Sequence, residues 1–105
     1  MKRIIAAVGG KARRITVIMP FLYESRQHKR NSRESLDCAL MLQELCAMGV
    51  SNIITFDAHD PRVHNAVPLM GFDNLMPSYQ VLKTMFETIE NFRPVKDSFM
   101  IISPD

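Results

Sequence analysis

The chain has 105 residues and a formal net charge of +2, with 47% hydrophobic and 23% charged residues. This length allows one domain with a small core, and the composition is ordinary for a globular protein. No apolar run reaches the roughly 18 residues that a membrane-spanning helix needs, and the apolar centre of the N-terminal stretch is too short for a signal peptide. We therefore expect a cytoplasmic protein with no membrane partner.

Strands and helices are expected to alternate along the chain. In chain order the expected elements are a short helix over 3–12, a strand Ile15–Met19, a helix from near Ser35 to Gly49, a strand Asn52–Phe56, a short strand Val67–Met70, a connection Gly71–Pro77, an amphipathic helix over 81–89 and a buried strand Phe99–Ile102. This alternation predicts an α/β fold, a parallel sheet flanked by helices.

Positive charge is concentrated near the N-terminus. Residues 1–33 contain nine Lys or Arg and one acid, a balance of +8, whereas residues 34–105 contain four basic and ten acidic residues, a balance of −6. A basic arm of this kind suits either nucleic acid or a compact phosphate ligand. Phe21 and Tyr23 precede the cations and do not alternate with them, so no stacking platform for bases is evident. A compact phosphate ligand, and no nucleic acid, is the better interpretation.

The basic residues Arg26, Lys29, Arg30 and Arg33 belong to one polar loop, which follows the first expected strand. Ligands of open α/β sheets bind at the carboxyl ends of the strands, and cations there suit phosphate. The competing interpretation is a solvated basic loop without function.

Polar residues also follow the later strands. Asp57, His59 and Asp60 come after the second expected strand, and Asp105 comes after the last. All would lie at the same edge as the basic loop, where a metal–nucleotide site needs cations for phosphates and hard ligands for Mg²⁺. Taken singly, Asp57 and Asp60 are also compatible with turn formation.

Five short motifs run through the chain in order: Arg14-Ile-Thr-Val-Ile-Met-Pro20, Tyr23-Glu-Ser-Arg26-Gln27 with Ser32-Arg33, Asp57-Ala-His59, Asp73-Asn74-Leu75 and Ser103-Pro-Asp105. Together they resemble the ribose-phosphate pyrophosphokinase family, also called phosphoribosyl pyrophosphate synthetases. The resemblance implies a truncated, Rossmann-like phosphoribosyltransferase fold, in which residues 1–105 are a single partial domain from the middle of the N-terminal domain.

The resemblance also implies a function. Members of the family transfer diphosphate from ATP to ribose 5-phosphate to give phosphoribosyl pyrophosphate, use Mg²⁺ and form homo-oligomers. It assigns Arg26, Gln27 and Arg33 to ATP binding and His59 and Asp105 to the metal, and it identifies no catalytic residue in this chain. The segments that hold ribose 5-phosphate in the family are missing, so we expect the isolated chain to be inactive.

The sequence departs from the family pattern at several positions. His28 stands where an acid usually follows the Arg-Gln pair, Ala58 replaces a common Leu, and the residues after His59 differ from the usual segment. The family is also about three times longer, as expected for a pair of domains. A second hypothesis is a non-catalytic regulatory paralogue, which binds nucleotide or joins the oligomer. A third hypothesis is a basic nucleic-acid-binding domain.

Overall fold

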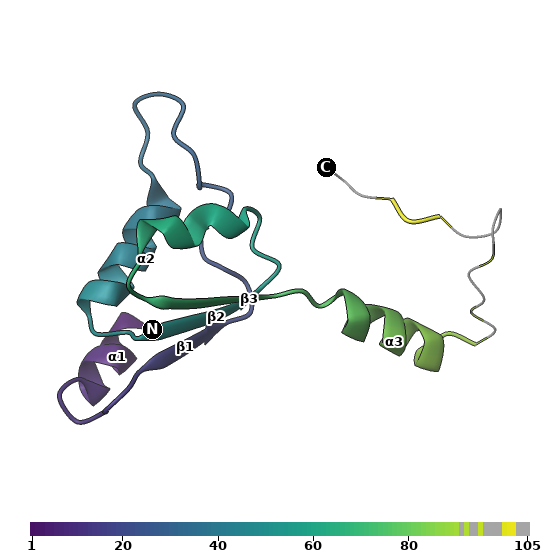
Figure 1. The fold of residues 1–105 in the computed structure, drawn as a ribbon, viewed down its shortest axis with the longest axis horizontal. Coiled ribbons are helices and arrows are strands. Elements are labelled where there is room, and N and C mark those ends of the chain that lie inside the picture. Colours follow the sequence, from purple (N-terminus) through teal and green to yellow (C-terminus); the bar gives the residue numbers. More distant parts are fainter. Residues whose placement is uncertain (91, 93–94, 96–99, 103–105) are drawn as a thin grey trace.

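Three parallel strands form the centre of the molecule (Figure 1). The structure is a computed structural model that describes residues 1–90, 92, 95 and 100–102. In spatial order the strands are β1 (Thr16–Met19), β2 (Asn52–Phe56) and β3 (Gly71–Leu75). The helices are α1 (Lys2–Val8), α2 (Asp37–Ala47), the 3₁₀ helix η1 (Pro61–Ala66) and α3 (Ser78–Thr88). Among the described residues, none of these helices has the length and apolar character needed to cross a membrane.

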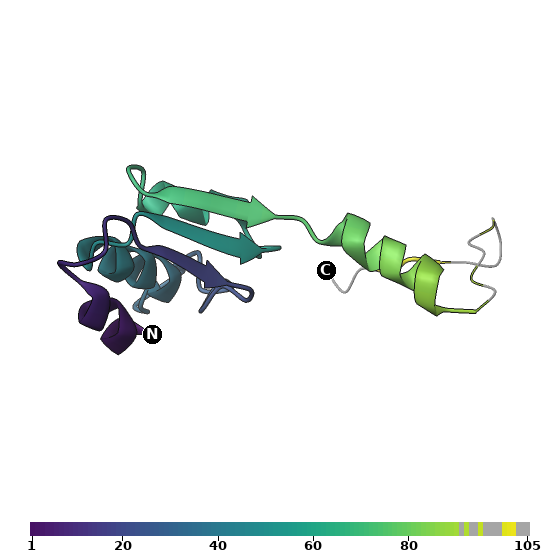
Figure 2. The same ribbon diagram turned by 90° about the horizontal axis from the view of Figure 1, so that it is seen from below.

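Helices cover one face of the sheet, and the described residues leave the other face bare. Helices α2 and η1 cover the first face, and α1 packs beside α2, where Lys2 pairs with Glu44 at 2.5 Å (Figure 1). The inward strand residues Val17 and Ile53 are directly paired and buried. Figure 2 shows the strands from below, where the second face lies toward the viewer. No described strand residue on this face is buried, and Ile18 is 65% exposed. The core therefore lies on the helical side of the sheet.

Helix α2 and strand β2 form where the sequence pattern predicts them. Four apolar residues of α2 recur at helical spacing and are all buried: Cys38, Met41, Leu42 and Leu45. Gly49 follows the helix with a φ of +88°, a conformation that favours glycine and ends the helix as expected. The N-cap is Leu36 and not Ser35, and no side chain caps this end by a hydrogen bond. Strand β2 has the predicted bounds.

The third strand was predicted in the wrong place. Val67 and Met70 are buried but belong to a turn, in which the Met70 amide donates to the Val67 carbonyl at 3.0 Å. The strand is formed by Gly71–Leu75, a segment whose Asp and Asn suggested a connection. Both side chains make contacts across the strands, because Asp73 accepts from Asn52 Nδ2 at 2.9 Å and Asn74 accepts from the Ala58 amide at 3.0 Å. An edge strand tolerates such polar residues.

The described residues after β3 do not join the sheet. Helix α3 was expected, but it contains no buried residue and extends beyond the end of β3 in both views (Figures 1 and 2). The predicted buried strand Phe99–Ile102 is wrong at its described residues, since residues 100–102 have no strand conformation and are at least 76% exposed. A strand needs a hydrogen-bonding neighbour, and α3 does not return this segment to the sheet. Phe99 and Asp105 lie outside the described residues.

Candidate nucleotide-binding edge

The carboxyl ends of the strands bring two polar loops together. Loop 20–36 follows β1, and loop 57–60 follows β2, which is parallel to β1. The two loops meet through His28 and His59, whose ring centroids lie 5.1 Å apart. The structure thus places the base of the basic loop and His59 at one edge of the sheet.

The first half of loop 20–36 is firmly held against the core. Leu22 and Ser25 are buried, and Glu24 adopts a φ of +53°, which turns the chain back on itself. The Gln27 amide donates to the Glu24 carbonyl at 2.8 Å, and the Cys38 amide of α2 donates to the Gln27 carbonyl at 3.4 Å. By contrast, residues 29–35 are all exposed and project beyond α2 (blue in Figure 1).

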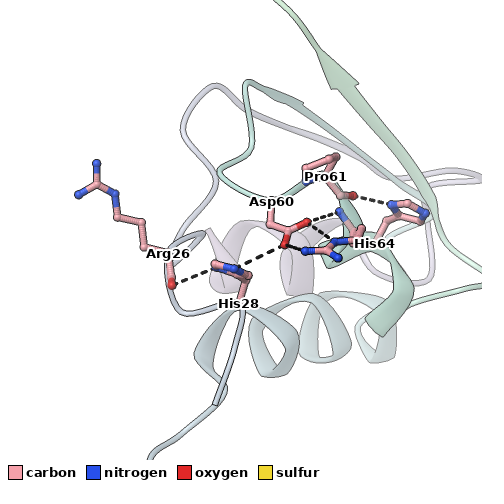
Figure 3. Close-up of polar contacts among 6 residues, drawn as sticks. Arg26, His28, Asp60, Pro61 and His64 are labelled. Carbon is pink, nitrogen blue, oxygen red and sulfur yellow. Dashed lines mark hydrogen bonds and ion pairs between the residues drawn. The ribbon is translucent and has the colours of Figure 1, made fainter. Parts of the chain in front are cut away.

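The predicted ATP-binding residues differ in how they are held. Arg26 comes from the anchored half of the loop and is exposed, with its side chain directed away from His28 and Asp60 (Figure 3). Gln27 is half-buried, and its Oε1 is buried without a hydrogen-bond partner among the described residues. Arg33 lies in the exposed half and is itself exposed. Arg26 and Gln27 therefore both lie in the anchored base of the loop, whereas Arg33 lies in the projecting part.

His28 connects the two loops (Figure 3). Its Nδ1 lies 3.2 Å from the carbonyl oxygen of Arg26, and its Nε2 lies 3.5 Å from Oδ2 of Asp60. The side chains of His28 and Asp60 are only 13% and 12% exposed. A single ring thus reaches from the backbone of one loop to a carboxylate of the other.

Arg62 holds the Asp60 carboxylate from the opposite side. Its Nε donates to Oδ1 at 3.0 Å, its Nη2 donates to Oδ2 at 2.7 Å, and its backbone amide donates to Oδ1 at 2.9 Å. These bonds from the Arg62 side chain and backbone hold the pKa of the Asp60 carboxyl well below its usual range. The same carboxylate raises the pKa of the Arg62 guanidinium.

Local geometry explains why Asp60 and Arg62 meet. Asp60 is the N-cap of η1, and Pro61 occupies the first turn, where a missing amide hydrogen costs nothing. Sequence reasoning left Asp60 open between a polar residue of this edge and a turn former, and it did not identify Arg62. The available signal was the Asp-Pro-Arg order, which places an arginine amide and side chain beside the capping carboxylate.

The described residues do not fit a self-contained magnesium site. Asp57 and His59 are exposed at this edge, and Arg62 already engages Asp60. No group of three His, Cys, Asp or Glu side chains suited to a metal occurs in the described part of the chain. Since Asp105 lies outside the described residues, the assignment of Mg²⁺ to His59 and Asp105 stays a prediction.

Comparison with known proteins identifies relatives of this chain. A family model described as the N-terminal domain of ribose phosphate pyrophosphokinase matches residues 1–49. The ribose-phosphate pyrophosphokinase of Caulobacter vibrioides is 29% identical over 94 residues, which are 89% of this chain and 28% of that protein. Phosphoribosyl pyrophosphate synthase-associated protein 1 of Homo sapiens is 33% identical over 82 residues, 78% of this chain and 23% of that protein.

A solved structure agrees with these relatives. The crystal structure of phosphoribosylpyrophosphate synthetase from Mycobacterium smegmatis superposes with a TM-score of 0.74 at 26% identity, over 83% of this chain and 30% of that chain. The chain belongs to the ribose-phosphate pyrophosphokinase family. Its three-stranded parallel sheet with flanking helices is part of a phosphoribosyltransferase-like fold. It spans less than a third of the length of each of these three relatives.

Proposed function

We propose that residues 1–105 are part of the first domain of a ribose-phosphate diphosphokinase and supply one side of its ATP site. The contact between the His28 and His59 rings, at 5.1 Å, carries this proposal. Through it, the loop with Arg26 and Gln27 lies against the loop with His59 at the carboxyl edge of a parallel sheet. Ligands of such sheets bind at this edge.

The side chains at this edge suit a nucleotide. The exposed guanidinium groups of Arg26 and Arg33 can donate charge-assisted hydrogen bonds to phosphate oxygens. The buried Oε1 of Gln27, which lacks a partner among the described residues, can accept a hydrogen bond from an amine or hydroxyl group. An unsatisfied buried acceptor is costly, so such a donor would stabilise the site.

We propose diphosphate transfer only for the complete protein. That protein would act as an oligomer, with ribose 5-phosphate as the second substrate and Mg²⁺ as the metal ion. The chain spans 28% of the Caulobacter relative and 30% of the Mycobacterium chain. Catalysis by positioning requires both substrates to be held in a reactive geometry. We therefore expect the chain by itself to bind ATP without forming phosphoribosyl pyrophosphate.

A second candidate is a non-catalytic regulatory role. The observation in its favour is the 33% identity with a relative whose name describes it as associated with the synthase. Such a protein would bind nucleotide or join the oligomer without transferring diphosphate. A diphosphate-transfer assay on the complete protein separates the candidates, since product formation would exclude the second one.

The Arg26→Ala variant tests the proposed ATP site. If the Arg26 guanidinium bonds phosphate, its removal should weaken ATP binding by about tenfold to a hundredfold, because hydrogen bonds to charged groups contribute about 1.5–3 kcal/mol. Isothermal titration calorimetry of the chain with ATP measures this change. The matched control is Arg13→Ala, which removes another exposed arginine, located before β1 at the opposite edge of the sheet.

Two results would contradict the proposal. Equal ATP affinity in the wild type and Arg26→Ala would identify the loop as a solvated basic turn. An equal loss in Arg13→Ala would mean that net charge, and not a site at the carboxyl edge, determines ATP binding.

A further inference from the structure

His28 lies between the two loops that carry the proposed site residues. We propose that His28 is a positioning residue, which joins loop 20–36 to the Asp60 carboxylate and thereby fixes Arg26 for its ligand. The identity of that ligand, ATP, rests on the function proposed above. The positioning role of His28 rests on the contacts of its ring.

The two ring nitrogens of His28 have different partners on opposite sides. A carbonyl oxygen can only accept a hydrogen bond, so the Nδ1 atom 3.2 Å from the Arg26 carbonyl must donate. In the protonated ring, Nε2 also donates, toward Oδ2 of Asp60 at 3.5 Å. The rigid imidazole therefore sets the distance between the Arg26 backbone and the Asp60 carboxylate.

Asp60 is a fixed anchor for this link. Three hydrogen bonds from Arg62 hold its two oxygens, and the 3₁₀ helix η1 begins directly after it. Its side chain is 12% exposed, so water competes little for the carboxylate. Asp60 is thus fixed to the folded domain, and its contact with His28 holds the His28 ring to the domain as well.

The link acts on the backbone of Arg26 and leaves its side chain available. His28 bonds the Arg26 carbonyl, whereas the guanidinium points away from the cluster (Figure 3). On the other side, the Gln27 amide bonds Glu24 and the Gln27 carbonyl bonds α2. Without His28, the carbonyl between Arg26 and Gln27 loses its bond, and the base of the loop becomes freer.

Two substitutions of similar volume separate hydrogen bonding from packing. His28→Met fills the space but has no donor, and His28→Gln restores one amide donor. His64→Met is the matched control, since His64 Nδ1 also lies near a backbone carbonyl, that of Pro61 at 2.6 Å, but within η1 and not between the loops. ATP affinity by calorimetry and the ¹⁵N order parameter of the Arg26 amide are measured for each variant.

We expect His28→Met to weaken ATP binding about threefold to tenfold, the size of one or two hydrogen bonds, and to lower the Arg26 order parameter. His28→Gln should recover part of both, and His64→Met should match the wild type. Because His28 acts through Asp60, His28→Met should reduce ATP affinity less in the Asp60→Asn variant than it does in the wild type.

An unchanged Arg26 order parameter in His28→Met would overturn the proposal, and so would additive losses in the double variant. The order parameter is measured without ATP. If the wild type fails to bind ATP at millimolar concentration, the proposed function fails, while the Arg26 order parameter still decides whether His28 positions the loop. If His28→Met does not fold, a wild-type order parameter in His28→Ala would overturn the proposal, and a lowered one would support it.

Discussion

His28 and Asp60 belong to two segments that the resemblance leads us to expect to differ from the family pattern, and the structure shows these two residues in contact. The acid that the resemblance implies at position 28 would face the Asp60 carboxylate unfavourably, whereas histidine fits it. Asp60 and Arg62 belong to the segment after His59, where a difference from the pattern is also expected. The two departures are 32 residues apart in sequence, so only the folded chain shows that they are one feature.

The Asp60–Arg62 pair predicts how stability depends on pH. The pKa of Asp60 is lowered in the folded state by bonds from Arg62, so the ionised carboxylate favours folding at any pH above about 4, the usual pKa of an unfolded aspartate. That contribution is lost as the pH falls below 4 toward the lower folded-state pKa. Urea unfolding of Asp60→Asn should therefore show a shallower loss of stability between pH 5 and pH 2 than the wild type. Parallel curves for the two proteins would contradict this reading.

At the scale of elements, the local sequence pattern correctly predicted the helix and the strand whose formation depends on local contacts. The spacing of Cys38, Met41 and Leu45 and the stop at Gly49 determine α2, and the apolar run 52–56 determines β2. Strand β3 was missed because its polar residues are satisfied by Asn52 and Ala58, more than 15 positions away. No local pattern contains those partners.

The location of the candidate site could be predicted from the sequence, but the contacts within it could not. Parallel strands place the loops after β1 and β2 at one edge, so the approach of the basic loop to His59 follows from topology alone. The outward direction of Arg26 and the link through His28 depend on a left-handed turn at Glu24 and on an N-cap at Asp60. Those conformations arise from packing of the loops, which sequence periodicity does not describe.

Helix α3 predicts self-association of the chain. The apolar side chains Val81, Leu82 and Phe86 of α3 and Ile89 at its C-cap are 41–55% exposed. The bare face of the sheet exposes Ile18 as well. Apolar surface of this extent favours association. Sedimentation velocity at micromolar concentration should show dimers or larger species, and Leu82→Glu with Phe86→Glu should shift them to monomer.

The control for this prediction adds the same charge elsewhere on α3. Gln80→Glu with Thr84→Glu introduces two acids at exposed polar positions and should leave the association unchanged. A wild-type monomer at micromolar concentration, or equal dissociation by both pairs of substitutions, would contradict a role for the apolar side of α3.

At the scale of the whole molecule, the fold is a parallel sheet with helices on one face and polar loops at the carboxyl ends of its strands. The relatives extend well beyond the segment matched here, since the chain spans 30% of the Mycobacterium chain. This agrees with the proposal that residues 1–105 are a partial domain. The anchored base of loop 20–36 and loop 57–60 already meet within the chain, so ATP binding at this edge can be tested directly.

The most direct test is an ATP titration of the ¹⁵N-labelled chain followed by NMR. We predict that amide shifts concentrate in residues 21–28 and 57–60, at the carboxyl edge, while residues 9–14 and 49–51, at the amino edge, stay in place. Arg26→Ala should abolish most of these shifts. An unchanged spectrum at millimolar ATP, or shifts centred on the amino edge, would contradict the claim that the carboxyl edge forms part of an ATP site.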